Sequence, residues 1–139
     1  MNDTQAISGE AFDWVKARLA CSPEKVFQHL KLEVTADVAS RNTAPTSMGK
    51  WQFDMTSHNG SFVVFVKGRD SNKGAVTFEQ TERGIDVKNE KDAIVLSATL
   101  TINNSKECRL KVSGQEYEPW QFRKMALEEL FFGDPWRAA

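Results

Sequence analysis

Apolar and polar residues alternate with a period of two in the middle of the chain, over residues 50–56 and again over residues 61–67. This pattern is typical of strands that bury one face. Between them lies Asn59-Gly60, the dipeptide that most readily adopts the positive φ angles of a two-residue hairpin turn. The two segments are therefore predicted to form a hairpin that pairs His58 with Ser61, Met55 with Val64, and Phe53 with Val66.

Four further segments are predicted to be strands, and short turns rich in Gly, Asn and Asp separate them. They cover residues 75–80, 84–88, 93–103 and 108–112. Strands joined in succession by short loops pair with their neighbours in opposite directions. The sequence thus predicts an antiparallel meander.

A helix is predicted to begin at Ser22-Pro23, because Ser caps free amide groups and Pro is tolerated at the first helical position. The apolar stripe that follows at the helical period consists of Val26, Phe27, Leu30, Val34 and Val38. The pattern fades by Asn42, and Leu32 lies off the stripe, which leaves open a break into two shorter helices.

A last helix is predicted to open at Pro119 and to end at Gly133. Its apolar positions are Trp120, Phe122, Ala126, Leu127, Leu130 and Phe131, and they cover about half of the helix circumference. This face is expected to pack on the open face of the meander.

Residues 10–21 fit two patterns equally well. Phe12, Val15 and Leu19 fit a helix stripe, whereas Val15, Ala17, Leu19 and Cys21 fit one face of a strand. A strand that leads directly into the Ser22 cap agrees better with the rest of the chain. The fold class predicted is therefore α+β, in the order β-α-β6-α, with one domain over residues 1–139.

Composition supports a single globular domain. The chain has 139 residues, of which 40% are hydrophobic and 27% charged, and its formal net charge is −1. A charge so close to zero provides no basic field for nucleic acid. No apolar run is long enough for a membrane span, and the polar N-terminus predicts a cytoplasmic protein whose Cys21 and Cys108 are reduced, buried thiols.

One run beside the predicted helix start resembles the START/Bet v1-like (SRPBCC) helix-grip superfamily, in which the first strand commonly ends in a small-x-Ser-Pro-Glu-x-Val-Phe/Trp-x-x-Leu sequence. The run is Ala20-Cys21-Ser22-Pro23-Glu24-Lys25-Val26-Phe27-Gln28-His29-Leu30. The resemblance implies an antiparallel sheet curled around the C-terminal helix. It also implies an apolar cavity between them, of the kind used for lipids, hormones, polyketides or aromatic compounds.

Catalytic chemistry finds little support in the residues. The two histidines and two cysteines have no metal-ligand spacing, and no nucleotide-binding motif occurs. Cys21 has no base placed beside it by the sequence, and His29 and His58 are expected at the surface. The sequence therefore favours a non-catalytic protein without a cofactor.

The aromatic residues suggest where a ligand would bind. The chain has nine Phe and four Trp but one Tyr, so its rings are mostly apolar. A small apolar, aromatic or lipid-like ligand is expected between the sheet and the last helix, entering near the loop 41–49 or the loop 69–74. The expected wall of this site consists of Trp51, Phe53, Met55, Phe62, Val64, Phe78, Trp120 and Leu127.

The alternative is a protein–protein interaction module, or a homodimer, with a filled core. This hypothesis depends on apolar residues placed away from the predicted buried faces, because such groups mark contacts when they cluster. They are Val63, Phe65, Met125, Phe132 and Trp136.

Overall fold

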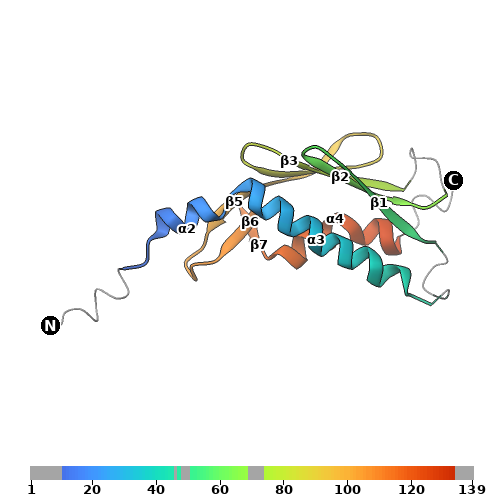
Figure 1. Ribbon diagram of the computed structural model, residues 1–139, viewed down its shortest axis with the longest axis horizontal. Helices are drawn as coiled ribbons and strands as arrows, with labels where there is room; N and C mark the ends of the chain where they lie inside the picture. The colour runs from blue at the N-terminus through green and yellow to red at the C-terminus, as the bar shows by residue number, and fades with distance from the viewer. Residues whose placement is uncertain (1–10, 46, 48–50, 69–73, 134–139) are drawn as a thin grey trace.

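The computed structural model of the protein describes residues 11–45, 47, 51–68 and 74–133. It has the α+β class, and its sheet curves over two neighbouring helices (Figure 1). The helices are α2 (Trp14–Ala20), α3 (Pro23–Asn42) and α4 (Pro119–Phe132). The strands are β1 (Phe53–His58), β2 (Ser61–Val66), β3 (Ala75–Gln80), β4 (Gly84–Lys88), β5 (Ile94–Ile102), β6 (Cys108–Val112) and β7 (Gln115–Tyr117).

The seven strands form one antiparallel sheet in the order of the sequence, which confirms the predicted meander. The hairpin register is also confirmed, because His58 pairs with Ser61 and Met55 with Val64. Gly60 takes the positive φ of 77° that the tight turn requires. The short strand β7 was not predicted, and it adds a seventh strand at the far edge of the sheet.

Helix α3 begins where the sequence predicts. The hydroxyl of Ser22 accepts a hydrogen bond from the backbone N–H of Lys25 at 3.2 Å, and Pro23 occupies the first turn. The helix is unbroken over 20 residues. Because Leu32 lies off the apolar stripe, its side chain points to solvent, and 70% of it is exposed.

The prediction of a strand at residues 10–21 is wrong, because residues 14–20 form the helix α2. The carboxylate of Asp13 accepts a hydrogen bond from the N–H of Lys16 at 3.0 Å and so caps this helix. The alternating residues do not face the core, since Val15 is 48% exposed and Leu19 72%. Within the described residues, the order of elements is therefore two helices, seven strands and a last helix.

The space between the sheet and the helices is packed with aromatic rings. The Phe62 ring lies 4.8 Å from that of Phe78 and 5.3 Å from that of Phe27, which α3 contributes. At the other end of the sheet, the Phe53 ring lies 5.0 Å from that of Phe131 on α4. Each of these five side chains is at most 6% exposed. Both α3 and α4 thus cover the same face of the sheet.

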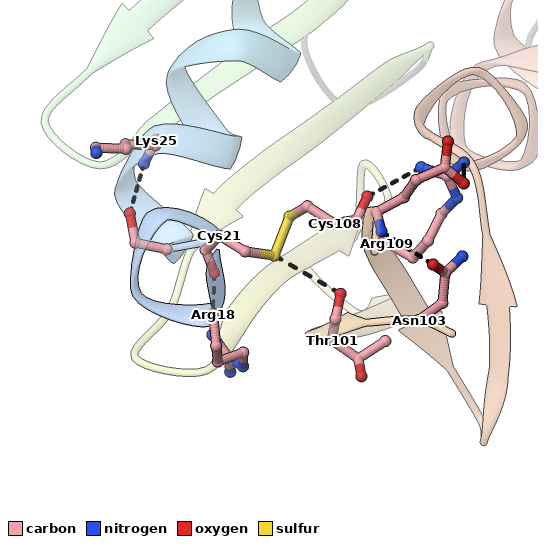
Figure 2. The surroundings of a disulfide bond; sticks show 9 residues. Arg18, Cys21, Lys25, Thr101, Asn103, Cys108 and Arg109 are labelled. Carbon is pink, nitrogen blue, oxygen red and sulfur yellow. Dashed lines mark hydrogen bonds and ion pairs between the residues drawn. A yellow bond between two sulfur atoms is a disulfide. The ribbon is translucent and has the colours of Figure 1, made fainter. Parts of the chain in front are cut away.

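The cysteines form a disulfide bond, so the prediction of two reduced thiols is wrong (Figure 2). The bond joins Cys21, between α2 and α3, to Cys108 on β6, with their Cα atoms 5.5 Å apart. The Cys21 sulfur also lies 3.7 Å from the carbonyl oxygen of Thr101 on β5. The junction of α2 and α3 is therefore attached covalently to the sheet.

The start of the outer edge of β1 is covered by a side chain of α3. The amide of Asn42 accepts a hydrogen bond from the N–H of Phe53 at 2.8 Å and donates one to its carbonyl oxygen at 2.9 Å. The carboxylate of Asp54 accepts from the N–H of Met55 at 2.8 Å. These side chains occupy backbone groups that a further strand would otherwise use.

Candidate functional site

Helices α3 and α4 lie side by side and run in the same direction (Figure 1). Arg123 of α4 connects them in the middle, because its guanidinium group lies 3.1 Å from the carboxylate of Glu33 and 2.7 Å from that of Asp37. One turn further along α3, Arg41 donates to the carbonyl oxygen of Phe131 at 2.8 Å. The two helices therefore meet along a seam that has a hollow on either side of the Arg123 ion pairs.

The larger hollow, which we call the aromatic groove, has a volume of about 600 Å³. Its floor is apolar, since Leu127 and Phe131 are almost fully buried. Its rim carries two large half-exposed rings, Trp120 at 53% and Phe132 at 51%. The complete lining is Asp37, Ser40, Arg41, Ala44, Pro45, Trp120, Arg123, Lys124, Leu127, Glu128, Phe131 and Phe132.

Arg41 is a charged side chain that is only 4% exposed at one end of the groove. Its guanidinium carbon lies 5.1 Å from the centre of the Phe53 ring and 5.3 Å from that of Phe132. Both helices end here, so their carbonyl groups present two negative dipole ends to this cation. The arrangement stabilises the buried charge and holds the Phe132 ring at the rim.

The other charged residues of the groove pair with one another. Asp37 pairs with Arg123, and Lys124 pairs with Glu128 at 2.9 Å one helical turn away. These pairs orient the side chains along the seam. They leave aromatic and aliphatic groups as the main surface that the groove offers to an occupant.

The smaller hollow, which we call the basal pocket, lies at the opposite end of the seam and has a volume of about 360 Å³. It lies where α3 and α4 begin, beside strands β5 and β6 and next to the disulfide. His29 lines it and lies 3.6 Å from the carboxylate of Glu33. The lining is Lys25, Val26, His29, Leu30, Glu33, Leu100, Cys108, Arg109, Leu110 and Pro119.

The structure separates the eight predicted site residues into two groups. The sheet residues Phe53, Phe62, Val64 and Phe78 are at most 1% exposed, while Trp51 and Met55 are partly buried and pack against the same core. Trp120 and Leu127 lie in the aromatic groove. Trp120 was expected to face the sheet, but its side chain is 53% exposed and lines the groove on the outer side of α4.

The structure also places four of the five residues on which the interaction hypothesis depends. Met125 and Phe132 lie off the buried stripe of α4 as predicted, at 39% and 51% exposure. Val63 and Phe65 are half-buried on the outer face of the sheet and line a separate hollow with Asn89, Glu90 and Asp92. Trp136 and most of the predicted entrance loop 69–74 lie outside the described residues.

The outer sheet face is polar around Val63 and Phe65. Lys88 on β4 donates to the carboxylate of Glu79 on β3 at 3.1 Å, and this hydrogen bond raises the pKa of Lys88 above its ordinary value. Ser97 on β5 donates to Asp86 at 2.7 Å. The aromatic groove carries the exposed rings of Trp120 and Phe132, whereas Phe65 on this face of the sheet is half-buried.

Sequence reasoning missed the two arginines that shape the seam. Arg123 occurs between apolar stripe positions of the last helix, and only its spacing from Phe122 and Ala126 shows that it borders the buried face. Arg41 occurs in the last turn of its helix, where a cation is ordinarily favourable for that helix alone. Neither signal indicates that α3 and α4 are neighbours.

Comparison of the chain with protein-family models, with curated proteins and with solved structures finds no match. Among the described residues, no group of three or more His, Cys, Asp or Glu side chains is placed to hold a metal ion. No helix in the described part of the chain has the length and apolar character needed to cross a membrane. Function must therefore be inferred from the seam itself.

Proposed function

We propose that the protein is a non-catalytic binding protein that takes a small apolar or aromatic ligand in the aromatic groove. The observation that carries this proposal is the pair of half-exposed rings, Trp120 and Phe132, above a buried apolar floor. Ligand sites are commonly hollows of about 300–1,000 Å³ with mainly apolar walls and a few polar groups. The groove has this size and this lining.

The groove is a better candidate than the space beneath the sheet. A ligand among Phe62, Phe78 and Phe27 would have to displace rings that already contact one another. Closely packed interiors resist such insertion, because the displaced contacts and the resulting strain both cost free energy. A ligand in the groove would instead cover aromatic surface that is now exposed to water.

The proposal can be tested with anilinonaphthalene sulfonate, a fluorescent apolar anion. We expect saturable binding to one site per chain, with energy transfer from Trp120. Trp120→Ala should raise the dissociation constant about tenfold, since removing a central aromatic contact commonly costs more than 1 kcal/mol.

The matched control is Met125→Ala, because Met125 lies on the same helix and is 39% exposed but does not line the groove. This variant should bind the probe as the wild type does. Unsaturable binding, or equal affinity in Trp120→Ala and wild type, would exclude the groove as the ligand site.

We also propose that the fold belongs to the helix-grip class. The support is the antiparallel sheet that curves over the C-terminal helix, together with the Ser22-Pro23 helix start. The chain departs from that pattern at its N-terminal side, where α2 replaces the first strand. The sheet also covers α3 in addition to α4, which accounts for the filled interior.

Cytoplasmic location remains a prediction, and the disulfide argues against it. Structural disulfides persist in oxidising compartments, whereas cytosolic thiols are usually kept reduced. Titration of free thiols in protein taken directly from its source, under denaturing conditions, tests this point. Two free thiols per chain would favour the cytoplasm, and none would favour an oxidising compartment.

A further inference from the structure

We propose that the aromatic groove also receives helix α2 of a second copy of this chain, so that two copies exchange their α2 helices. This inference rests on the proposed function, because it uses the same groove as a binding site. It identifies a protein partner, and it predicts that the partner helix and a small ligand compete.

Helix α2 has no partner within the described part of its own chain that covers its apolar side. None of its residues is buried, and Trp14 is 64%, Val15 48% and Leu19 72% exposed. An isolated helix of fewer than about 12–15 residues is marginal in water. With seven residues, α2 depends on its cap and on its attachment at Cys21, and an apolar partner would stabilise it further.

The helix cannot reach the groove of its own chain. The disulfide fixes its C-terminal end to β6, and α2 projects from there away from the body of the molecule (Figures 1 and 2). On α3 the groove begins at Asp37, about 20 Å along the helix from Pro23 at 1.5 Å per residue. A helix as short as α2 spans only about 10 Å. Because α2 also points away from α3 and α4 (Figure 1), a groove that receives it belongs to a second copy.

The two surfaces fit each other in chemistry. An amphipathic helix binds a groove through apolar residues spaced by about one turn, and Val15 and Leu19 have this spacing, with Trp14 beside them. The groove presents Trp120, Phe132 and the floor formed by Leu127 and Phe131. Tryptophan side chains on both surfaces are the residue type most often found at the centre of protein interfaces.

The buried area that a specific interface needs favours a reciprocal exchange, in which each copy inserts its α2 helix into the groove of the other. A covered aromatic side chain contributes about 150–250 Å², so one short helix in one groove buries only some hundreds of Å². A specific interface needs about 1,000 Å² or more. Two symmetric contacts approach this value, and they close the assembly as a dimer instead of leaving free ends.

Sedimentation velocity over a range of protein concentrations tests the exchange. We expect a monomer–dimer equilibrium in the wild type, and Leu19→Asp should raise the dimer dissociation constant more than about tenfold. The matched control is Leu32→Asp, because Leu32 on α3 is 70% exposed, like Leu19 at 72%, but lies outside the groove. Leu32→Asp should leave the dimer unchanged.

A mixing experiment identifies the contact. Trp120→Asp damages the groove and leaves α2 intact, whereas Leu19→Asp does the reverse. Each variant alone loses both contacts, and an equimolar mixture keeps one, so the dimer dissociation constant of the mixture should lie above that of the wild type and below that of either variant. Circular dichroism and thermal unfolding establish that both variants remain folded.

Results that overturn the exchange differ from those that overturn the proposed function. A wild type that stays monomeric at its highest soluble concentration, or a dimer that survives Trp120→Asp, would exclude the exchange. If such a protein still bound anilinonaphthalene sulfonate in the groove, the proposed function would stand. Displacement of the dimer by the probe would support both proposals.

Discussion

At the scale of single residues, Phe53 shows how fully the interior is occupied. Its side chain is 1% exposed, and the Phe131 ring and the Arg41 guanidinium group lie on it. Phe53→Trp should lower the free energy of unfolding by about 1–3 kcal/mol, because added volume in a filled core forces neighbours out of their preferred positions. Urea unfolding followed by circular dichroism measures the change. An unchanged stability would show that space for the larger ring exists beneath the sheet.

Ser22 provides a second test at this scale. Its hydroxyl caps α3 through the N–H of Lys25. Ser22→Ala should lower stability by about 1 kcal/mol, because the amide then loses its partner. Ser22→Asp is the matched control, since a carboxylate also caps and also favours the positive end of the helix. Thermal unfolding should place Ser22→Asp near the wild type and Ser22→Ala below it.

At the scale of elements, the disulfide connects parts of the chain that are 87 residues apart. A cross-link over so long a loop restricts the unfolded chain strongly, and such bonds typically add about 2–4 kcal/mol of stability. Replacing both Cys21 and Cys108 by Ser should therefore lower the free energy of unfolding by about this amount.

Urea unfolding of that double variant should agree with unfolding of the wild type in a reducing agent. The same comparison by sedimentation tests the position of α2, which the bond holds at β6. Loss of the bond should weaken the α2 exchange. A double variant as stable as the oxidised wild type would show that the unfolded chain gains little freedom when the bond is absent.

Elements with strong local signals could be predicted from the sequence. The hairpin register follows from Asn59-Gly60 and from alternation on both sides, and α3 begins at its predicted cap. α2 could not be predicted, because in so short a segment Val15 and Leu19 satisfy the helical and the strand pattern alike. β7 was missed because its three residues, Gln115–Tyr117, carry no apolar alternation.

At the scale of the whole molecule, the candidate site depends on contacts that no local pattern contains. Trp120 and Leu127 were predicted as ligand-binding residues, and both line the groove. Trp120 was predicted to face the sheet, but it lies on the outer side of α4. The groove exists because α3 and α4 run side by side, and the sheet that lies between them in sequence sets this arrangement. The pairing of Cys21 with Cys108 likewise depends on where β6 lies in the sheet.

The side chain that covers the start of the β1 edge affects how copies of this protein can assemble. Asn42 hydrogen-bonds both outward backbone groups of Phe53, so these groups are not available to pair with a strand of another molecule. Open-ended polymers that grow by adding strand to strand are therefore hindered at this position of the sheet. Pairing of another strand with the start of β1 should accordingly require that Asn42 first release both backbone groups of Phe53.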